Sequence, residues 1–198
     1  YDAGQAVTTG VKNVLIGGLA GDALTDADFN VAVGYAALGA DTLGSRSTAL
    51  GYLALSAQNF TTATDAYNTA VGMFAGGLVT TGTANTLIGG LSGDAITTGA
   101  FNTGVGTGSL GALTTGSNNV AIGEVALDAS TEAGDNVAVG VSALGADVLG
   151  SRSVAVGRAA LTNQNFTTAT ETYNVAVGYN AGGAVTTGTF NSLVGGLA

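Results

Sequence analysis

The stretch Asn30-Val-Ala-Val-Gly34 decides the fold, because its pattern occurs eleven times along the chain. Each copy opens with Asn or Ser, continues with three small or branched residues and closes with Gly. The opening residues are Asn13, Asn30, Ser47, Asn68, Asn85, Asn102, Asn119, Asn136, Ser153, Asn174 and Asn191. Consecutive copies are 17 residues apart, except after Ser47 and Ser153, where the interval is 21 residues. A fixed period of this length predicts a stacked solenoid.

Several coils together form a larger sequence repeat. Residues 30–91 recur at 136–197, so that Gly44-Ser-Arg-Ser47 returns as Gly150-Ser-Arg-Ser153. The pattern starts and stops in the middle of a coil, and neither end carries the polar cap that a solenoid needs. We therefore expect residues 1–198 to be a single repetitive segment, taken from a longer fibre.

Composition favours strands and excludes several classes of protein. The chain is rich in Val and Thr, has 34 Gly and no Pro, and contains few long helix formers. It has no Cys and no His, which excludes disulfides and thiolate metal sites. Its net charge of −9 disfavours nucleic acids, which require clustered Lys and Arg. No apolar run is long enough for a transmembrane helix, so we expect no membrane insertion.

Numbering each coil from its Asn gives a prediction for every position. Position four is aliphatic in all eleven copies, and we expect it to fill the inside of the coil together with position two. Positions three and eight are small and are expected on the outside. The Gly at position five predicts a positive φ or a close backbone approach. We therefore expect each coil to consist of a short strand, a Gly turn, a second short strand and a return segment, in which the sequence Thr-Thr-Gly recurs. The fold predicted is all-β, a parallel β-solenoid of about eleven coils paired in register.

The Asn column has two interpretations. A side-chain amide that stacks on its copy in the next coil forms a hydrogen-bonded ladder at the turn. Alternatively, the aligned amides bind a polar ligand. The first interpretation is favoured because Ser47 and Ser153 keep a short hydrogen-bonding group.

Outward columns of small apolar residues indicate self-association. A strand that is apolar on both faces must be buried on both faces, and a single thin rod leaves one face in water. In-register packing of three rods around a common axis is the simplest closed arrangement.

The repeats also resemble a known architecture. The stretches Asn30-Val-Ala-Val-Gly-Tyr-Ala-Ala-Leu38, Asn118-Asn-Val-Ala-Ile-Gly-Glu-Val-Ala-Leu127 and Ser153-Val-Ala-Val-Gly-Arg-Ala-Ala-Leu161 resemble head repeats of trimeric autotransporter adhesins. They are equally similar to the repeat arrays of phage tail fibres, which the Thr-Thr-Gly return suits better. The resemblance covers nearly the whole chain. It implies a left-handed, homotrimeric β-roll displayed on a virion tail or a cell surface.

Candidate chemistry is sparse. Gly106-Thr-Gly-Ser-Leu-Gly111 matches a dinucleotide fingerprint, but its glycines follow the repeat phase and no helix is expected after it. No His or Cys is present to act as base or nucleophile, and the carboxylates are scattered, so the chain is not expected to be an enzyme. Asp22, Asp26 and Asp28 are read as turn charges instead of a Ca²⁺ site. No cofactor and no metal are predicted.

The two 21-residue coils are the best candidates for recognition. Their extra residues lie in the return loops 57–67 and 163–173, and loops on a rigid scaffold often bind ligands. The candidate receptor contacts are Asn59, Phe60, Tyr67, Asn165, Phe166 and Tyr173, whose rings can stack on a sugar of a host-surface glycan or contact a host protein. The alternative, which we favour, is that the extra residues only widen the coil and bury their Phe.

Two arginines suggest ion pairs. Arg46 and Arg152 each precede the Ser that replaces Asn. We expect them to pair with Asp41 and Asp147, or with an acid of a neighbouring chain.

Three functions remain open from the sequence. The first is a structural segment of a trimeric phage tail fibre involved in host attachment, and the second is the head of a bacterial trimeric adhesin. The third is an ice-binding solenoid, because regular Thr ranks on a flat sheet can match ice. The Thr-Thr pairs, however, fall in the return and are missing from several coils, such as 30–46.

Overall fold

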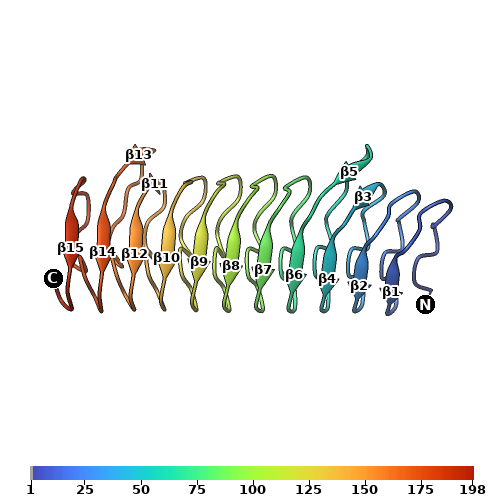
Figure 1. The fold of residues 1–198 in the computed structure, drawn as a ribbon, viewed down its shortest axis with the longest axis horizontal. Coiled ribbons are helices and arrows are strands. Elements are labelled where there is room, and N and C mark those ends of the chain that lie inside the picture. Colours follow the sequence, from blue (N-terminus) through green and yellow to red (C-terminus); the bar gives the residue numbers. More distant parts are fainter. Residues whose placement is uncertain (1) are drawn as a thin grey trace.

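The computed structural model describes residues 2–198 as a rod of stacked coils, with the two chain ends at opposite ends of the rod (Figure 1). One strand from each coil joins a single parallel sheet. Its strands, in spatial and chain order, are β1 (Val14–Ile16), β2 (Val31–Val33), β4 (Thr48–Leu50), β6 (Thr69–Val71), β7 (Thr86–Ile88), β8 (Thr103–Val105), β9 (Val120–Ile122), β10 (Val137–Val139), β12 (Val154–Val156), β14 (Val175–Val177) and β15 (Ser192–Val194).

The register of this sheet follows the repeat. Val120 pairs with Val137 and Ala121 with Ala138, so each position lies against its own copy in the next coil. The same register holds across the 21-residue coils, where Thr48 pairs with Thr69. The extra residues therefore leave the main sheet undisturbed. They form short separate ladders, β3 (Gly44–Ser45) with β5 (Thr64–Asp65) and β11 (Gly150–Ser151) with β13 (Thr170–Glu171). The predicted parallel β-solenoid is confirmed.

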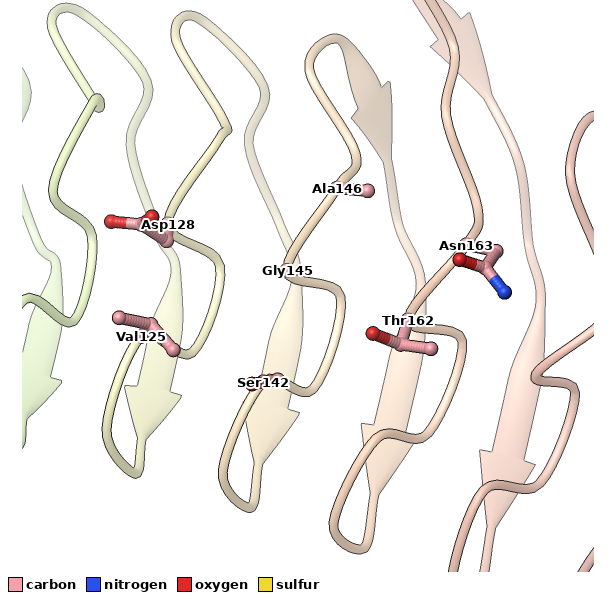
Figure 2. Close-up of a pocket in the computed structure, with 7 residues that line it drawn as sticks. All are labelled: Val125, Asp128, Ser142, Gly145, Ala146, Thr162 and Asn163. Atoms are coloured by element: carbon pink, nitrogen blue, oxygen red, sulfur yellow. The ribbon is translucent and has the colours of Figure 1, made fainter.

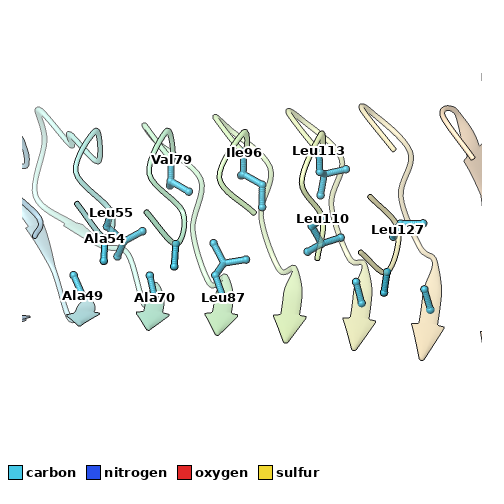
Figure 3. Close-up of a cluster of buried hydrophobic side chains, with 14 of the residues drawn as sticks. Ala49, Ala54, Leu55, Ala70, Val79, Leu87, Ile96, Leu110, Leu113 and Leu127 are labelled. Carbon is cyan, nitrogen blue, oxygen red and sulfur yellow. The ribbon is translucent and has the colours of Figure 1, made fainter. Parts of the chain in front are cut away.

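The assignment of inside and outside was wrong. Position three is buried in every coil except the terminal ones, as at Ala49 and Leu87, whereas position four is exposed to 44% at Leu50 and 39% at Ile88. Positions eight, nine and twelve complete the core, as at Ala54, and Figure 3 shows these side chains converging inside the coils. The interior is too narrow for a branched side chain at position four of every coil, so the larger residues of each strand face outward.

Large and small residues compensate one another inside the rod. Leu87 occupies position three of its coil, and a side chain at Gly93, position nine of the same coil, would meet Leu87 Cδ2 at 2.6 Å. In the next coil Gly104 occupies position three and Leu110 occupies position nine. In these two coils a large residue at one position is thus matched by a glycine at the other, as close packing requires.

The Gly at position five is required for both of the predicted reasons. Gly106 has a φ of +134°, a conformation that side chains rarely adopt. A Cβ on Gly106 would also lie 2.5 Å from the carbonyl oxygen of Gly123 in the next coil. The column therefore allows successive coils to approach closely at this turn.

Contrary to the expectation, no second strand begins directly after the Gly turn in residues 2–198, and the second strands described there are the two-residue β3, β5, β11 and β13 in the return of four coils. Positions seven and nine adopt left-handed backbone conformations even where they are not Gly, as at Val125 (φ 47°) and Leu127 (φ 52°). This segment therefore curls tightly and does not extend as a strand.

The Asn column forms the predicted ladder. The backbone N–H of Asn102 donates to Asn85 Oδ1 at 3.0 Å, and Asn102 Nδ2 donates to the carbonyl oxygen of Gly116 at 2.9 Å. Asn85 and Asn102 are fully buried, so their amides are used within the rod and do not face a ligand. The returning Thr residues act similarly, because Thr97 Oγ1 donates to the carbonyl oxygen of Thr114 at 3.2 Å.

Candidate interaction surfaces

The outward side of the main sheet is a largely apolar surface, with an aliphatic residue at position four of every coil and Val or Thr at position two of most coils. We call it the apolar face and define it by positions two and four of the coils, flanked by position six and by the last residue of each coil. Within residues 2–198, 17 of the 21 exposed large hydrophobic residues belong to it. They are Val14, Ile16, Phe29, Tyr35, Leu50, Tyr52, Tyr67, Met73, Ile88, Phe101, Ile122, Val141, Tyr173, Val177, Tyr179, Phe190 and Val194. Such a patch marks an interaction site more often than a free surface.

One edge of the apolar face carries stacked aromatic and basic side chains. Lys12 Nζ lies 4.8 Å from the centre of the Phe29 ring. The Arg46 guanidinium, from the next coil, also lies 4.8 Å from the centre of this ring. Arg46 also lies 5.9 Å from the centre of Tyr67. These cation–π contacts join four successive coils at their last residues.

The predicted receptor loops are only partly exposed. Phe60 and Phe166 are buried, at 6% and 7% exposure, so their rings cannot stack on a ligand. This outcome agrees with the favoured alternative, in which the extra residues bury their Phe. Asn59 and Asn165 are exposed.

The two tyrosines of these loops are exposed and lie at the edge of the apolar face. Tyr67 is 57% exposed and Tyr173 is 41% exposed. Tyr173 stacks on Phe190 with the ring centres 5.2 Å apart. Of the six predicted contact residues, four thus remain available to a partner.

The expected pairing of Arg46 with Asp41 and of Arg152 with Asp147 was wrong. Arg46 Nε lies 2.8 Å from Asp65 Oδ1, and Arg152 contacts Glu171 at 2.7 Å and Asp135 at 3.7 Å. The pKa of Arg46 is raised by the hydrogen bond and charge of Asp65. The pKa of Arg152 is raised by its hydrogen bond to Tyr173 and by the charge of Glu171. A hollow of about 440 Å³ lies beside Arg152, lined also by Asp135 and Glu171.

Asp41 and Asp147 instead lie in the core, at 0% and 1% exposure. Asp41 Oδ1 accepts hydrogen bonds from the backbone N–H groups of Gly44 at 3.1 Å and Phe60 at 2.9 Å. Asp41 Oδ2 accepts from Gln58 Nε2 at 2.6 Å. Three donors thus compensate for the loss of water around this carboxylate.

Gln58 links this carboxylate to the Asn ladder. Its Nε2 also donates to Ser47 Oγ at 3.1 Å, and its Oε1 accepts from Asn68 Nδ2 at 2.9 Å. The second extended coil repeats the arrangement with Asp147, Gln164, Ser153 and Asn174. This network was not predicted from the sequence. Its available signal was the joint occurrence of Ser for Asn, an Asp in the preceding coil and a Gln in the extended coil.

A separate hollow of about 330 Å³ opens on the turn segments after strands β9, β10 and β12. Its lining is Val125, Asp128, Ser142, Gly145, Ala146, Thr162 and Asn163. Figure 2 shows Asp128 and Val125 on one coil, Ser142, Gly145 and Ala146 on the next, and Thr162 and Asn163 on the third. We call this hollow the Gly145 notch. None of its residues belongs to the apolar face.

Burial affects two carboxyl groups in the same column as the notch. Desolvation raises the pKa of Asp128 above its ordinary value. Desolvation also raises the pKa of Asp94, and the charge of Asp128 adds to that increase. Both groups therefore resist ionisation slightly more than an aspartate in water.

Several alternatives find no support within residues 2–198. No three of the metal-binding acidic, His or Cys side chains cluster there, and no helix is long and apolar enough to cross a membrane. The glycines of the fingerprint-like stretch 106–111 lie in a strand-to-turn segment with no helix after it.

No protein-family model, curated protein or solved structure matches this chain. The fold and its surfaces define the chain as a parallel β-solenoid repeat protein of about eleven coils, with one apolar sheet face.

Proposed function

We propose that this chain is a shaft or head segment of a homotrimeric extracellular fibre, and specifically of a phage tail fibre that serves host attachment. Its role is mechanical and not catalytic. The hydrogen-bonded coils hold a receptor-binding part away from the particle on a virion tail. The observation that carries the proposal is the apolar face, which a single rod leaves in water along its whole length.

The size of the apolar face fits association with further copies of the same chain. Eleven strands about 4.8 Å apart make a face about 50 Å long, and four outward residues make it about 15 Å wide. The resulting area of about 750 Å² is close to the ~800 Å² that each partner contributes to a standard interface, and in a trimer each chain divides this area between two neighbours. An obligate assembly of this kind buries an apolar sheet as a domain core does.

The regularity of the face favours parallel, in-register packing. Position four is aliphatic in every coil, so copies related by a rotation axis along the rod place aliphatic residues at every level. In a triangular arrangement the edge with position six of one chain adjoins the edge with the last residues of the next. At two levels these edges carry compatible groups, Tyr52 beside Arg46 and Met73 beside Tyr67, whereas Arg158 beside Arg152 brings two like charges together. The resemblance to tail-fibre and adhesin repeats supports the trimer and the left-handed winding.

The test introduces charge on the apolar face. Ile88→Glu and Ile122→Glu change side chains that are 39% and 40% exposed in the single rod, so the rod itself tolerates them. We expect the double variant to dissociate into folded monomers, as seen by light scattering and circular dichroism. Leu78→Glu is the matched control, because Leu78 is 47% exposed but lies outside the face. If the double variant keeps the native mass, the face is not the interface.

The adhesin-head alternative shares this assembly. It differs in what the fibre is attached to, and it predicts direct binding to host matrix or cells by this segment. Binding of the purified trimer to cultured animal cells, measured by flow cytometry, favours the adhesin, whereas binding restricted to bacterial cells favours the tail fibre.

One observation favours ice binding as a second candidate function. Position two of the apolar face is Thr in four successive coils, at Thr48, Thr69, Thr86 and Thr103. Each is followed by an outward aliphatic residue two positions later, which makes a regular Thr rank on a flat sheet with a spacing of about 4.8 Å. Ice binding needs this face in water, whereas the fibre needs it buried. Thermal hysteresis that disappears in Thr86→Glu, in a monomeric protein, would replace the fibre proposal.

A further inference from the structure

The turn column that contains the notch alternates between polar residues and glycine. Position ten reads Asp22, Gly39, Ser56, Gly77, Asp94, Gly111, Asp128, Gly145, Thr162 and Gly183 along the rod. Because coils are about 4.8 Å apart, polar side chains recur about every 10 Å with a glycine gap between them. The column lies on the turn segments, away from the apolar face, and it stays accessible in the proposed trimer.

Most of the described glycine gaps are covered by a neighbouring side chain. A Cβ on Gly77 would meet the Phe74 ring at 2.7 Å, so that ring lies over the gap. Gly111 is covered by the Asp128 carboxylate, and Gly183 by the Asn180 amide. Gly145 differs, because the nearest atom to its added Cβ is the backbone oxygen of Ser142 at 3.2 Å. The Gly145 gap is therefore open, and it forms the hollow of about 330 Å³.

The groups around the Gly145 notch include one amide held by a hydrogen bond and two hydroxyls with free hydrogen-bonding capacity. Asn163 Nδ2 donates to the carbonyl oxygen of Gly183 at 2.6 Å, which orients the amide oxygen. The backbone N–H of Ser142 donates to the Glu124 carbonyl at 3.0 Å. Within residues 2–198, no protein group is hydrogen-bonded to the hydroxyls of Ser142 and Thr162. The notch thus presents two hydroxyls and an amide above small apolar groups, while the Asp128 carboxylate points away from it and covers the neighbouring Gly111 gap (Figure 2).

This chemistry selects one class of ligand. No Lys or Arg lines the notch, and Asp128 adds negative charge, so phosphate, sulfate and sialic acid are disfavoured. One carboxylate is too few ligands for a divalent cation. Hydroxyls and an amide around small apolar surface match a ligand rich in hydroxyl groups, and the volume lies in the range of small-molecule sites. We propose that the Gly145 notch binds one or two units of a neutral saccharide chain.

The first structural unit provides a matched comparison. There Gly39 forms the corresponding gap, and its added Cβ meets only backbone atoms, the nearest being the Ala36 oxygen at 3.1 Å. However, Ala36 stands in place of Ser142 and Ala57 in place of Asn163. The Gly39 gap therefore lacks a hydroxyl and the amide, and we assign the saccharide site to the Gly145 notch alone.

The experiment is saturation-transfer NMR on the full chain with neutral and anionic oligosaccharides. The probes are β-1,4-linked glucose and N-acetylglucosamine hexamers, an α-1,4-linked glucose hexamer and a sialylated oligosaccharide. We expect at least one neutral probe to bind with a Kd of about 1 mM, and Gly145→Leu and Asn163→Ala to weaken it at least about tenfold. Gly39→Leu, which adds the same side chain at the matched gap, should bind like the unmodified chain.

Three results would overturn the assignment: no saturation transfer from any neutral probe, unchanged binding by Gly145→Leu, or stronger transfer from the sialylated probe. None of these variants touches the apolar face. Loss of the saccharide site therefore leaves the native mass unchanged, and failure of the trimer leaves saccharide binding measurable on the monomer.

Discussion

In the regular coil 85–101, position twelve is Ile96, which is buried among aliphatic side chains. In the extended coil 47–67, the same position is Gln58, also fully buried, which hydrogen-bonds Asp41. The regular coil keeps Asn85 at its first position, whereas the extended coil has Ser47. Two residues have thus changed together between the two kinds of coil, and Asp41 of the preceding coil accompanies them.

The difference shows how the rod accepts four extra residues without breaking its ladder. In a regular step, Asn102 Nδ2 lies 3.2 Å from Asn85 Oδ1. After the extended coil, Asn68 Nδ2 donates to Gln58 Oε1 at 2.9 Å, because Ser47 offers no amide oxygen. The Gln side chain therefore replaces the missing Asn amide, and the small Ser leaves room for it. A buried polar network of this kind fixes one position for the insertion, since any shift would leave its members unpaired.

The largest expected effect concerns what both kinds of coil share, the glycine at position five. Gly106→Ala combines a φ of +134° with a Cβ 2.5 Å from the Gly123 oxygen, and we expect it to cost more than about 5 kcal/mol of unfolding free energy. Gly195→Ala is the control, because its φ is +132° but its Cβ would lie 3.8 Å from the nearest atom. Chemical denaturation measures both. Equal losses would show that conformation alone, and not coil contact, requires glycine.

The next effect separates the two kinds of coil. Asp41→Ala leaves the N–H groups of Gly44 and Phe60 and the Gln58 amide without their acceptor, at a cost of about 4 kcal/mol. Asp26→Ala removes an exposed carboxylate from a regular coil, where it accepts a hydrogen bond from Thr9, and should cost under about 1 kcal/mol. A similar small loss for both variants, measured by urea unfolding, would mean that the buried network contributes no specific stability.

Within the extended loop, the two aromatic residues should behave differently. Phe60 is buried, and Phe60→Ala should destabilise the chain by about 3 kcal/mol. Tyr67 is 57% exposed, and Tyr67→Ala should change stability by less than about 1 kcal/mol. Thermal unfolding of both variants measures the difference. A larger loss of stability in Tyr67→Ala than in Phe60→Ala would show that the loop buries Tyr67 and exposes Phe60.

Replacing Ser by Asn, or Asn by Ser, at the first position of a coil should have a smaller effect on stability. Ser47→Asn crowds the Gln58 amide, which lies 3.1 Å from Ser47 Oγ, and should cost about 2 kcal/mol. Asn85→Ser removes the hydrogen bonds of the Asn85 amide to Asn102 and Gly99, and should cost a similar amount. If Ser47→Asn stabilises the chain, the Ser is not an adaptation to Gln58.

The smallest effect depends on pH. Desolvation raises the pKa of Asp128 above 3.8, so the folded chain binds this proton more tightly than the unfolded chain. The contribution to stability is then fully present below the unfolded pKa and is lost as the pH rises through the folded pKa. Asp128→Asn should therefore stabilise the chain slightly at neutral pH and make no difference in acid. Melting temperatures near pH 3 and pH 7 test this, and a destabilised variant at pH 7 would contradict it.

Much of the fold could be predicted from the sequence because it is periodic. The 17-residue spacing gave the coil, the constant Gly gave the tight turn, and the Asn column gave the ladder. The direction of the strands' side chains could not be predicted, because a strand such as Val137–Val139 is apolar on both sides and alternation does not say which side faces inward. The deciding quantity is the narrow width of the rod, which depends on the curled segment after the Gly turn.

The candidate sites were less predictable for a related reason. Asp41 was paired with Arg46 because the two are close in the chain, but the coil turns Asp41 inward and Arg46 outward. Phe60 was a candidate contact residue, with burial as the favoured alternative, and it fills the space that the extra residues create. The Gly145 notch depends on contacts between residues 17 or 34 positions apart, which only the stacked coils bring together.

The central claim is that the apolar face is buried between copies of this chain. The most direct test is the native mass of the unmodified protein by light scattering, over a range of protein concentrations. The account predicts three times the chain mass of 18.9 kDa. A mass of one chain, stable at high concentration, would contradict it, and a mass of two chains would keep the interface but exclude the trimer.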